Sequence, residues 1–137
     1  MAEKLCGLRK KSGGGLKETV LWTNSAPTST FAGQTVTLSS DIDNFDYIKV
    51  NYRYITSSTV EYSVLASVSE LKTYSGNGTG RLAMSEVSGG GYFVYRPVTY
   101  SSNTALAIGG CGYVNGTTFT TNNGLCIPTS IVGCKFR

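Results

Sequence analysis

The sequence contains no histidine among its 137 residues. That absence excludes histidine-based catalytic triads, histidine general bases and imidazole metal sites. A cysteine nucleophile would need another activating group, and only Cys134 has a basic neighbour, Lys135. We therefore predict that the protein is not an enzyme. A pair of carboxylates that hydrolyses a glycoside stays open as an alternative, because spacing in the sequence cannot exclude two acids from meeting in space.

The sequence also lacks a secretory signal and any run of about 18 apolar residues that could span a bilayer. Its opening stretch, MAEKLCGLRKKSGGG, has no apolar centre. These absences predict a protein that is made in the cytoplasm and inserts into no membrane. The four cysteines, Cys6, Cys111, Cys126 and Cys134, form no CxxC pair, so we expect them to be free thiols.

Charge is scarce outside the N-terminal segment. Residues 1–17 hold five basic residues and one acidic residue, a net charge of +4, whereas the remaining residues hold seven of each sign. Three consecutive glycines, at positions 13–15, add a flexible joint. We predict a basic anchoring arm over residues 1–18 and one folded domain over 19–137. The arm has no interleaved aromatic residues and the body is neutral, so we expect no nucleic-acid partner.

The body is rich in Val, Ile, Thr, Tyr and Phe, in short runs separated by Gly, Asn and Ser clusters. This pattern is typical of sandwiches and barrels, and it predicts about eight strands in an all-β, antiparallel, jelly-roll-like β-sandwich. The predicted strands cover residues 19–23, 34–39, 46–55, 60–69, 79–87, 92–100, 104–114 and 125–135.

Two local features test this pattern. Residues 64–72 are the best helical candidate, but Tyr62, Val64, Ala66 and Val68 alternate as a strand would, and we predict a strand. Pro97 cannot donate a ladder hydrogen bond, so it predicts a sheet edge or a bulge.

The stretch NFDYIKVNYRYI, residues 44–55, predicts one buried and one exposed strand face. The exposed face carries a candidate surface contact that consists of Tyr47, Lys49, Asn51 and Arg53. The predicted core comprises Trp22, Val36, Leu38, Ile48, Val50, Val64, Val94, Ile108 and Ile127. The nine tyrosines could stack on sugars or anchor protein contacts, or serve as ordinary core residues.

An acidic stretch, DIDNFD, places Asp41, Asp43 and Asp46 close together, and their oxygens could gather around calcium. The spacing fails the EF-hand pattern, because Phe45 occupies a ligand position and no glycine and distal glutamate follow. A hydrophilic turn, in which the carboxylates cap their own backbone, is the alternative that we favour. We predict no metal and no cofactor.

The stretches LWTNSAPTSTFAGQTVTLS, residues 21–39, and TNNGLCIPTSIVGCKF, residues 121–136, resemble the start and the close of β-rich domains in virion proteins of tailed bacteriophages. Such domains often lie at the distal end of fibre or receptor-binding chains. The resemblance implies a non-enzymatic structural domain, commonly a homotrimer, that is exposed on a particle assembled in the host cytoplasm. It implies no catalytic residue.

These observations predict a virion protein that is anchored by its arm and displays its sandwich, with a host glycan or protein as a possible ligand. Other virion proteins would be its partners. Leu5, Cys6 and Leu8 would supply apolar anchor contacts, and Arg9, Lys10 and Lys11 would face acidic groups. A capsid decoration protein without a receptor is the first alternative, and a free carbohydrate-binding module is the second.

Overall fold

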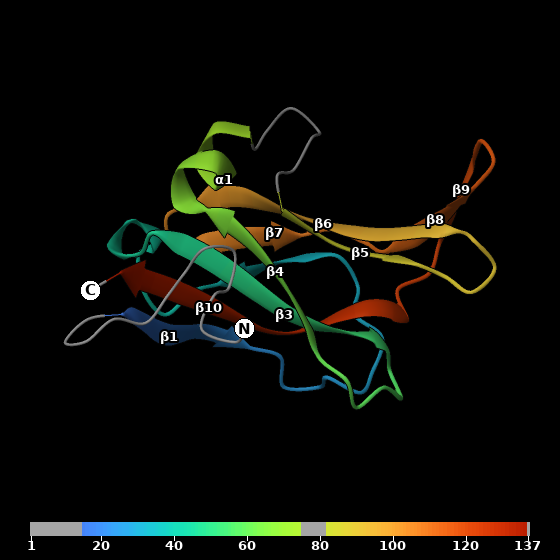
Figure 1. The fold of residues 1–137 in the computed structure, drawn as a ribbon, viewed down its shortest axis with the longest axis horizontal. Coiled ribbons are helices and arrows are strands. Elements are labelled where there is room, and N and C mark those ends of the chain that lie inside the picture. Colours follow the sequence, from blue (N-terminus) through green and yellow to red (C-terminus); the bar gives the residue numbers. More distant parts are fainter. Residues whose placement is uncertain (1–14, 75–81, 137) are drawn as a thin grey trace.

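The protein folds into an antiparallel β-sandwich, as predicted, in a computed structural model that describes residues 15–74 and 82–136 (Figure 1). All of its strand pairs are antiparallel. The described residues form ten strands, where the sequence pattern predicted about eight. Within the same residues, no helix is long and apolar enough to cross a membrane.

Sheet 1 has four strands in the order β1-β10-β3-β4. Its members are β1 (Leu16–Thr23), β10 (Leu125–Phe136), β3 (Tyr47–Ile55) and β4 (Tyr62–Ser67). Strand β1 begins at Leu16, three residues before the predicted start, because Leu16 to Glu18 continue the ladder with the end of β10. Residues 16–18, which were predicted to end the arm, therefore belong to the sheet.

Sheet 2 follows the order β2-β7-β6-β8-β9, with β5 paired to β6. Its members are β2 (Gln34–Thr37), β7 (Ala105–Ile108), β6 (Phe93–Ser102), β8 (Gly112–Asn115), β9 (Thr118–Thr121) and β5 (Leu82–Val87). In Figure 1 the β8–β9 hairpin projects at the end of the molecule opposite the C-terminus.

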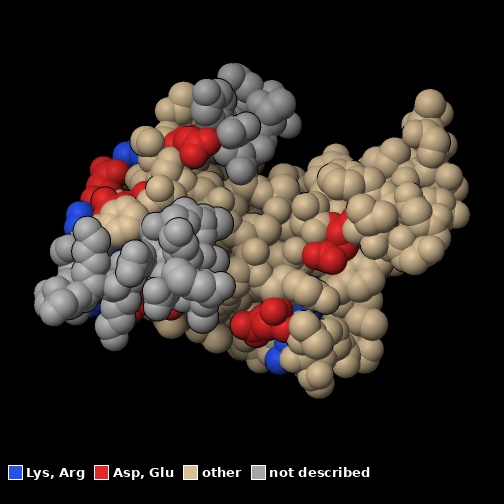
Figure 2. All heavy atoms as spheres, in the orientation of Figure 1, with Lys and Arg blue, Asp and Glu red and all other residues tan. Residues whose placement is uncertain are grey.

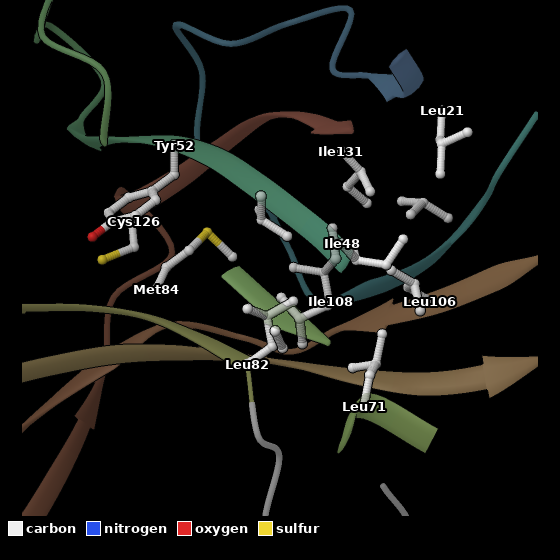
Figure 3. Close-up of a cluster of buried hydrophobic side chains, with 14 of the residues drawn as sticks. Leu21, Ile48, Tyr52, Leu71, Leu82, Met84, Leu106, Ile108, Cys126 and Ile131 are labelled. Atoms are coloured by element: carbon white, nitrogen blue, oxygen red, sulfur yellow. The ribbon is translucent and has the colours of Figure 1, made fainter. Parts of the chain in front are cut away.

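The core lies between the two sheets and combines side chains from nearly every strand (Figure 3). Seven of the nine predicted core residues are buried, whereas Trp22 and Val64 are partly buried and pack against them. Full burial of such an aliphatic side chain stabilises the fold by about 1.5–3 kcal/mol. The alternation of apolar residues therefore identified the inner faces correctly.

The predicted strand over residues 60–69 is wrong at its end, because the chain turns helical after β4. Helix α1 (Val68–Tyr74) follows directly, and its Leu71 is fully buried. The Oγ of Ser67 accepts a hydrogen bond from the backbone N–H of Glu70 at 3.1 Å. This Ser-x-x-Glu spacing is a capping box, which favours a helix start over a continued strand.

Of the two alternatives predicted at Pro97, the sheet edge is wrong, because β6 lies between β5 on one side and β7 and β8 on the other. The bulge is confirmed, because the three steps from Tyr95 to Val98 face four steps on the partner, from Gly112 to Ile108. The strand predicted over 104–114 is broken at residues 109–111, opposite Pro97. The carbonyl of Pro97 accepts the Gly109 N–H at 2.9 Å. A Cβ on Gly109 would lie 2.8 Å from the proline ring, so this close approach requires glycine.

Candidate functional site

The predicted contact face on β3 exists as a face of sheet 1. Tyr47, Lys49, Asn51 and Arg53 alternate with the buried residues of the strand, as the sequence pattern indicated. The ring of Tyr47 meets that of Phe136 edge-on, with centroids 5.7 Å apart. The four residues therefore share one surface, which faces away from the core.

Most of the polar groups on this face have partners within the sheet. Lys49 Nζ lies 2.7 Å from Glu18 Oε2, across the intervening strand β10. Asn51 Nδ2 donates to Ser130 Oγ at 2.9 Å, and Ser63 Oγ donates to Asn51 Oδ1 at 2.6 Å. These contacts tie neighbouring strands together, so the face has a structural use before it meets any ligand.

The carboxylates of the acidic stretch cap a short helix and pair with neighbouring groups, and Asp41 Oδ2 and Asp43 Oδ2 both accept from Asn103 Nδ2. Asp41 Oδ1 accepts the backbone N–H of Asp43 at 2.8 Å and so caps the short 3₁₀ helix η1 (Ile42–Asn44). Lys72 Nζ lies 2.7 Å from Asp43 Oδ1, and this hydrogen bond lowers the pKa of Asp43. Asp46 Oδ2 accepts the N–H of Phe136 at 2.8 Å. No three acids or cysteines of the described chain are arranged to hold a metal ion.

The predicted anchor lies outside the described residues. It consists of Leu5, Cys6, Leu8, Arg9, Lys10 and Lys11. The arm leads into the sheet at Leu16, which pairs with Phe136 at one end of the sandwich. Its docking role stays a prediction.

A buried arginine that the sequence pattern did not reveal organises the middle of sheet 2. Arg96 is fully buried, and its guanidinium stacks over the Phe31 ring at 5.3 Å. Its N–H groups donate at 2.8–3.2 Å to five backbone carbonyls, those of Cys126, Phe31, Gly109, Asn123 and Leu125. Burial lowers the pKa of Arg96. Because the five carbonyls come from three separate loops and strand ends, Arg96 holds these segments together.

Two buried thiols lie beside this arginine. The contact with Cys111, together with burial, raises the pKa of Cys126, while the same contact lowers the pKa of Cys111. Cys126 is also the one described non-glycine residue with a positive φ, at 46°. Cys111, Cys126 and Cys134 are free and buried, which agrees with the expectation of free thiols for these three cysteines. Burial keeps them from acting as exposed nucleophiles.

Several tyrosines lie near a hydrogen bond that connects the two sheets. The hydroxyl of Tyr52 on β3 donates a hydrogen bond to Glu86 Oε2 on β5 at 2.7 Å. Burial is the main cause that raises the pKa of Tyr52, and this hydrogen bond is the second. Tyr62 stands against Tyr52, with ring centroids 5.8 Å apart. Tyr92 and Tyr113 stack on each other at 5.4 Å. This end of the sandwich therefore offers aromatic planes together with Glu86 and the exposed Glu61, which precedes Tyr62.

The outer face of sheet 2 carries a row of apolar side chains at its far end. The strand register aligns Val87 with Phe93, Phe93 with Val114, and Val114 with Phe119. We call these four residues the apolar row. Tyr95 extends it, because its ring lies 5.7 Å from those of both Phe93 and Phe119. Val87 is 71% exposed, Phe93 49% and Phe119 48%.

The surface around the apolar row lacks charge. From residue 87 to residue 134 the chain has one charged residue, the buried Arg96. In Figure 2, basic and acidic atoms lie at the end that holds the C-terminus and across the middle of the visible face, while the outer part of the projecting end shows none. The two ends of the molecule therefore differ in chemistry.

Neither a scan against models of known protein families nor a search of curated proteins found a match.

Proposed function

We propose that this protein is a non-enzymatic structural protein of a tailed-bacteriophage particle. Its N-terminal arm anchors it to other virion proteins, and its sandwich is displayed outward for attachment to a host glycan or protein. The protein acts as a homo-oligomer, a trimer by its resemblance to fibre domains. The proposal starts from the resemblance of residues 21–39 and 121–136 to such domains.

The observation that carries the proposal is the polarity of the molecule. The arm joins the sheet at Leu16, which pairs with Phe136 at the end where the C-terminus lies. The exposed aromatic side chains of β6 and β9 lie toward the opposite, uncharged end. Anchoring at one end and contact at the other is the arrangement that a displayed domain needs.

The arrangement of acids supports a binding role over glycoside hydrolysis. Glu86, the one carboxylate of sheet 2, already accepts the hydroxyl of Tyr52 at its Oε2, and Glu61, which precedes Tyr62, is exposed to solvent. A hydrolase of the usual kind needs two carboxyl groups about 5–10 Å apart across a bound sugar. The tyrosines around Glu86 fit a sugar-stacking or protein-contacting surface better than a reaction centre.

Truncation of the arm tests the anchor. Removal of residues 1–14 spares the pairing of Leu16 with Phe136, so the sandwich should keep its melting temperature. We expect the truncated protein to be absent from purified particles, while the full chain is incorporated. Equal incorporation of both forms would overturn the proposal.

A substitution pair separates the two kinds of anchor contact. Leu5→Ala with Leu8→Ala should release the protein from the particle more readily than added salt does, because a buried leucine contributes about 1.5–3 kcal/mol and an exposed ion pair about 0–1 kcal/mol. Lys10→Ala with Lys11→Ala is the matched control. If moderate salt strips the full chain and the leucine variant stays attached, the anchor is electrostatic.

A free carbohydrate-binding module is the second candidate, and the exposed tyrosines Tyr62 and Tyr92 favour it. Such a module would bind sugars equally well with and without residues 1–14, and no particle would contain it. A capsid decoration protein would be incorporated through the arm but would leave host adsorption unchanged when absent. Adsorption of particles with and without the protein distinguishes this last alternative.

A further inference from the structure

We propose that the apolar row forms the contact between copies of this chain. The inference rests on the proposed function, in which the protein acts as a homo-oligomer, and it names the surface that joins the copies. The row crosses β5, β6, β8 and β9 as four side chains in direct register.

The row is an outer-face feature that no other described element covers. Along β6, Val94, Arg96 and Val98 are buried on the inner face, while Phe93 and Tyr95 alternate with them and face outward. The exposures of Val87, Phe93 and Phe119, between 48% and 71%, are high for apolar side chains on adjacent strands. A contiguous apolar surface of this kind marks a contact site.

The chemistry of the row fits a protein surface better than a sugar. Val87, Phe93, Val114 and Phe119 offer no hydrogen-bonding side chain, and a bound sugar would lose water from hydroxyls that then find no partner. The neighbouring turns supply a polar, uncharged border with Ser88 and Asn115. An apolar centre with a polar rim is the anatomy of a protein–protein interface.

The absence of charge points to a second copy of this chain as the occupant. A contact between copies has to be self-complementary, so each charge in it would need an opposite charge from the same surface. Residues 87–134 need no such pairing, because their one charge belongs to the buried Arg96. An apolar, uncharged surface can therefore meet its own copy without leaving any charge unpaired.

Strand β9 adds an open edge next to the row. It is the last strand in its sheet, and its four residues, Thr118 to Thr121, are all exposed. Natural proteins usually protect such an edge with lysine, proline or a bulge. β9 has none of these, so the surface next to the row stays accessible to another copy.

Lysine substitutions test the contact on the full chain. We expect light scattering after gel filtration to give a multiple of the 14.6 kDa chain mass for the wild type, and 14.6 kDa for Phe93→Lys. Val87→Lys, at a more exposed position, should raise the dissociation constant by about 100-fold, since the added ammonium is buried unpaired. Val20→Lys is the matched control, because Val20 is 58% exposed on a strand of sheet 1.

Circular dichroism and melting curves show whether each variant is folded. If Phe93→Lys does not fold, Val87→Lys still tests the contact. A wild type that stays monomeric up to high micromolar concentration overturns the inference, as does a Val20→Lys variant that dissociates as readily as Val87→Lys. These outcomes leave arm-dependent incorporation untouched. Conversely, an oligomer that forms in solution while particles never contain the protein overturns the proposed function alone.

Discussion

The two sheets handle charge in opposite ways. Sheet 1 contains five charged residues, Lys17, Glu18, Lys49, Arg53 and Lys135, and pairs at least Lys49 with Glu18 across its surface. Sheet 2 has more strands but contains two charged residues, Glu86 and Arg96. One of these is fully buried and the other accepts a hydrogen bond from Tyr52 of sheet 1.

On the outer face of sheet 1 most polar groups have partners, with the Nε of Arg53 as an exception, whereas the outer face of sheet 2 exposes apolar side chains. The side chains on the outer face of sheet 1 meet each other, as the contacts of Asn51 with Ser63 and Ser130 show. The side chains of the apolar row leave large exposed surfaces. Because desolvation of satisfied polar groups gains little, while burial of exposed apolar groups gains about 25 cal/mol per Å², sheet 2 has the surface with free energy to gain from a partner.

Among these substitutions, removal of the buried charge of Arg96 should lower the free energy of unfolding most. Arg96→Met fills a similar volume but removes the side-chain donor of five carbonyls, of which those of Phe31 and Cys126 belong to buried residues and that of Asn123 keeps the Phe31 N–H. At about 1–3 kcal/mol for each group that finds no water, we expect the free energy of unfolding to fall by about 4 kcal/mol or more. Urea denaturation measures it.

Arg53→Met on sheet 1 is the matched control for that experiment. The Nε of Arg53 is buried without a hydrogen-bond partner in the described part of the chain, so its loss should cost less than about 1 kcal/mol. Equal losses for the two variants would show that the carbonyl contacts of Arg96 contribute nothing particular.

Loss of the hydrogen bond between Tyr52 and Glu86 should lower the free energy of unfolding by less than loss of Arg96 does, and its contribution should depend on pH. Tyr52→Phe removes a donor to Glu86 and to the Ser85 carbonyl, with an expected loss of about 1 kcal/mol at pH 7. The pKa of Tyr52 is raised in the folded protein, so above its unfolded value near 10 only the unfolded chain releases this proton. Stability therefore falls as pH rises from 10.

The variant should lose this contribution to the pH dependence. Between pH 10 and 12, each single proton released only on unfolding lowers the free energy of unfolding by about 1.4 kcal/mol per pH unit. We expect the slope for Tyr52→Phe to be shallower than the wild-type slope by about that amount. Identical slopes in denaturant titrations at several pH values would contradict the role of the buried hydroxyl.

Much of the fold was predictable, because alternation depends on near neighbours in the sequence. The inner faces of β3 and β6 followed from it, whereas β10 is buried along most of its length and does not alternate. The helix α1 was missed because Tyr62, Val64, Ala66 and Val68 alternate up to its first residue, although the Ser67-x-x-Glu70 spacing was a readable signal.

The candidate contact surface was less predictable, since it depends on register between distant segments. Val87, Phe93, Val114 and Phe119 form a row only once four strands are aligned, and β9 itself was not predicted. The partners of Lys49 and Asn51 come from other strands as well. Alternation placed those residues outside the core but could not reveal that the sheet already uses them.

Breaking the ion pair between Lys49 and Glu18 on sheet 1 should lower the free energy of unfolding only slightly. Lys49→Met removes an ion pair with Glu18, whose side chain is 42% exposed, and solvent screens the interaction. We expect a loss of no more than about 1 kcal/mol in the free energy of unfolding, reduced further by salt. A loss as large as that for Arg96→Met would remove the contrast between the sheets.

The smallest effect is expected from reduction of the thiols. Cys111, Cys126 and Cys134 are free, so a reductant should leave the melting temperature unchanged. If a disulfide does form, Cys111 and Cys126 are the neighbouring pair, and their bridge would close a loop that contains β8 and β9. A drop of several degrees on reduction, which corresponds to roughly 2 kcal/mol or more, would identify such a bridge. Cys126→Ser should then lower the melting temperature of the unreduced protein further than Cys134→Ser does. Such a bridge would hold the β8–β9 hairpin covalently. The proposed contact surface would then be held in place by a disulfide in addition to the carbonyl contacts of Arg96.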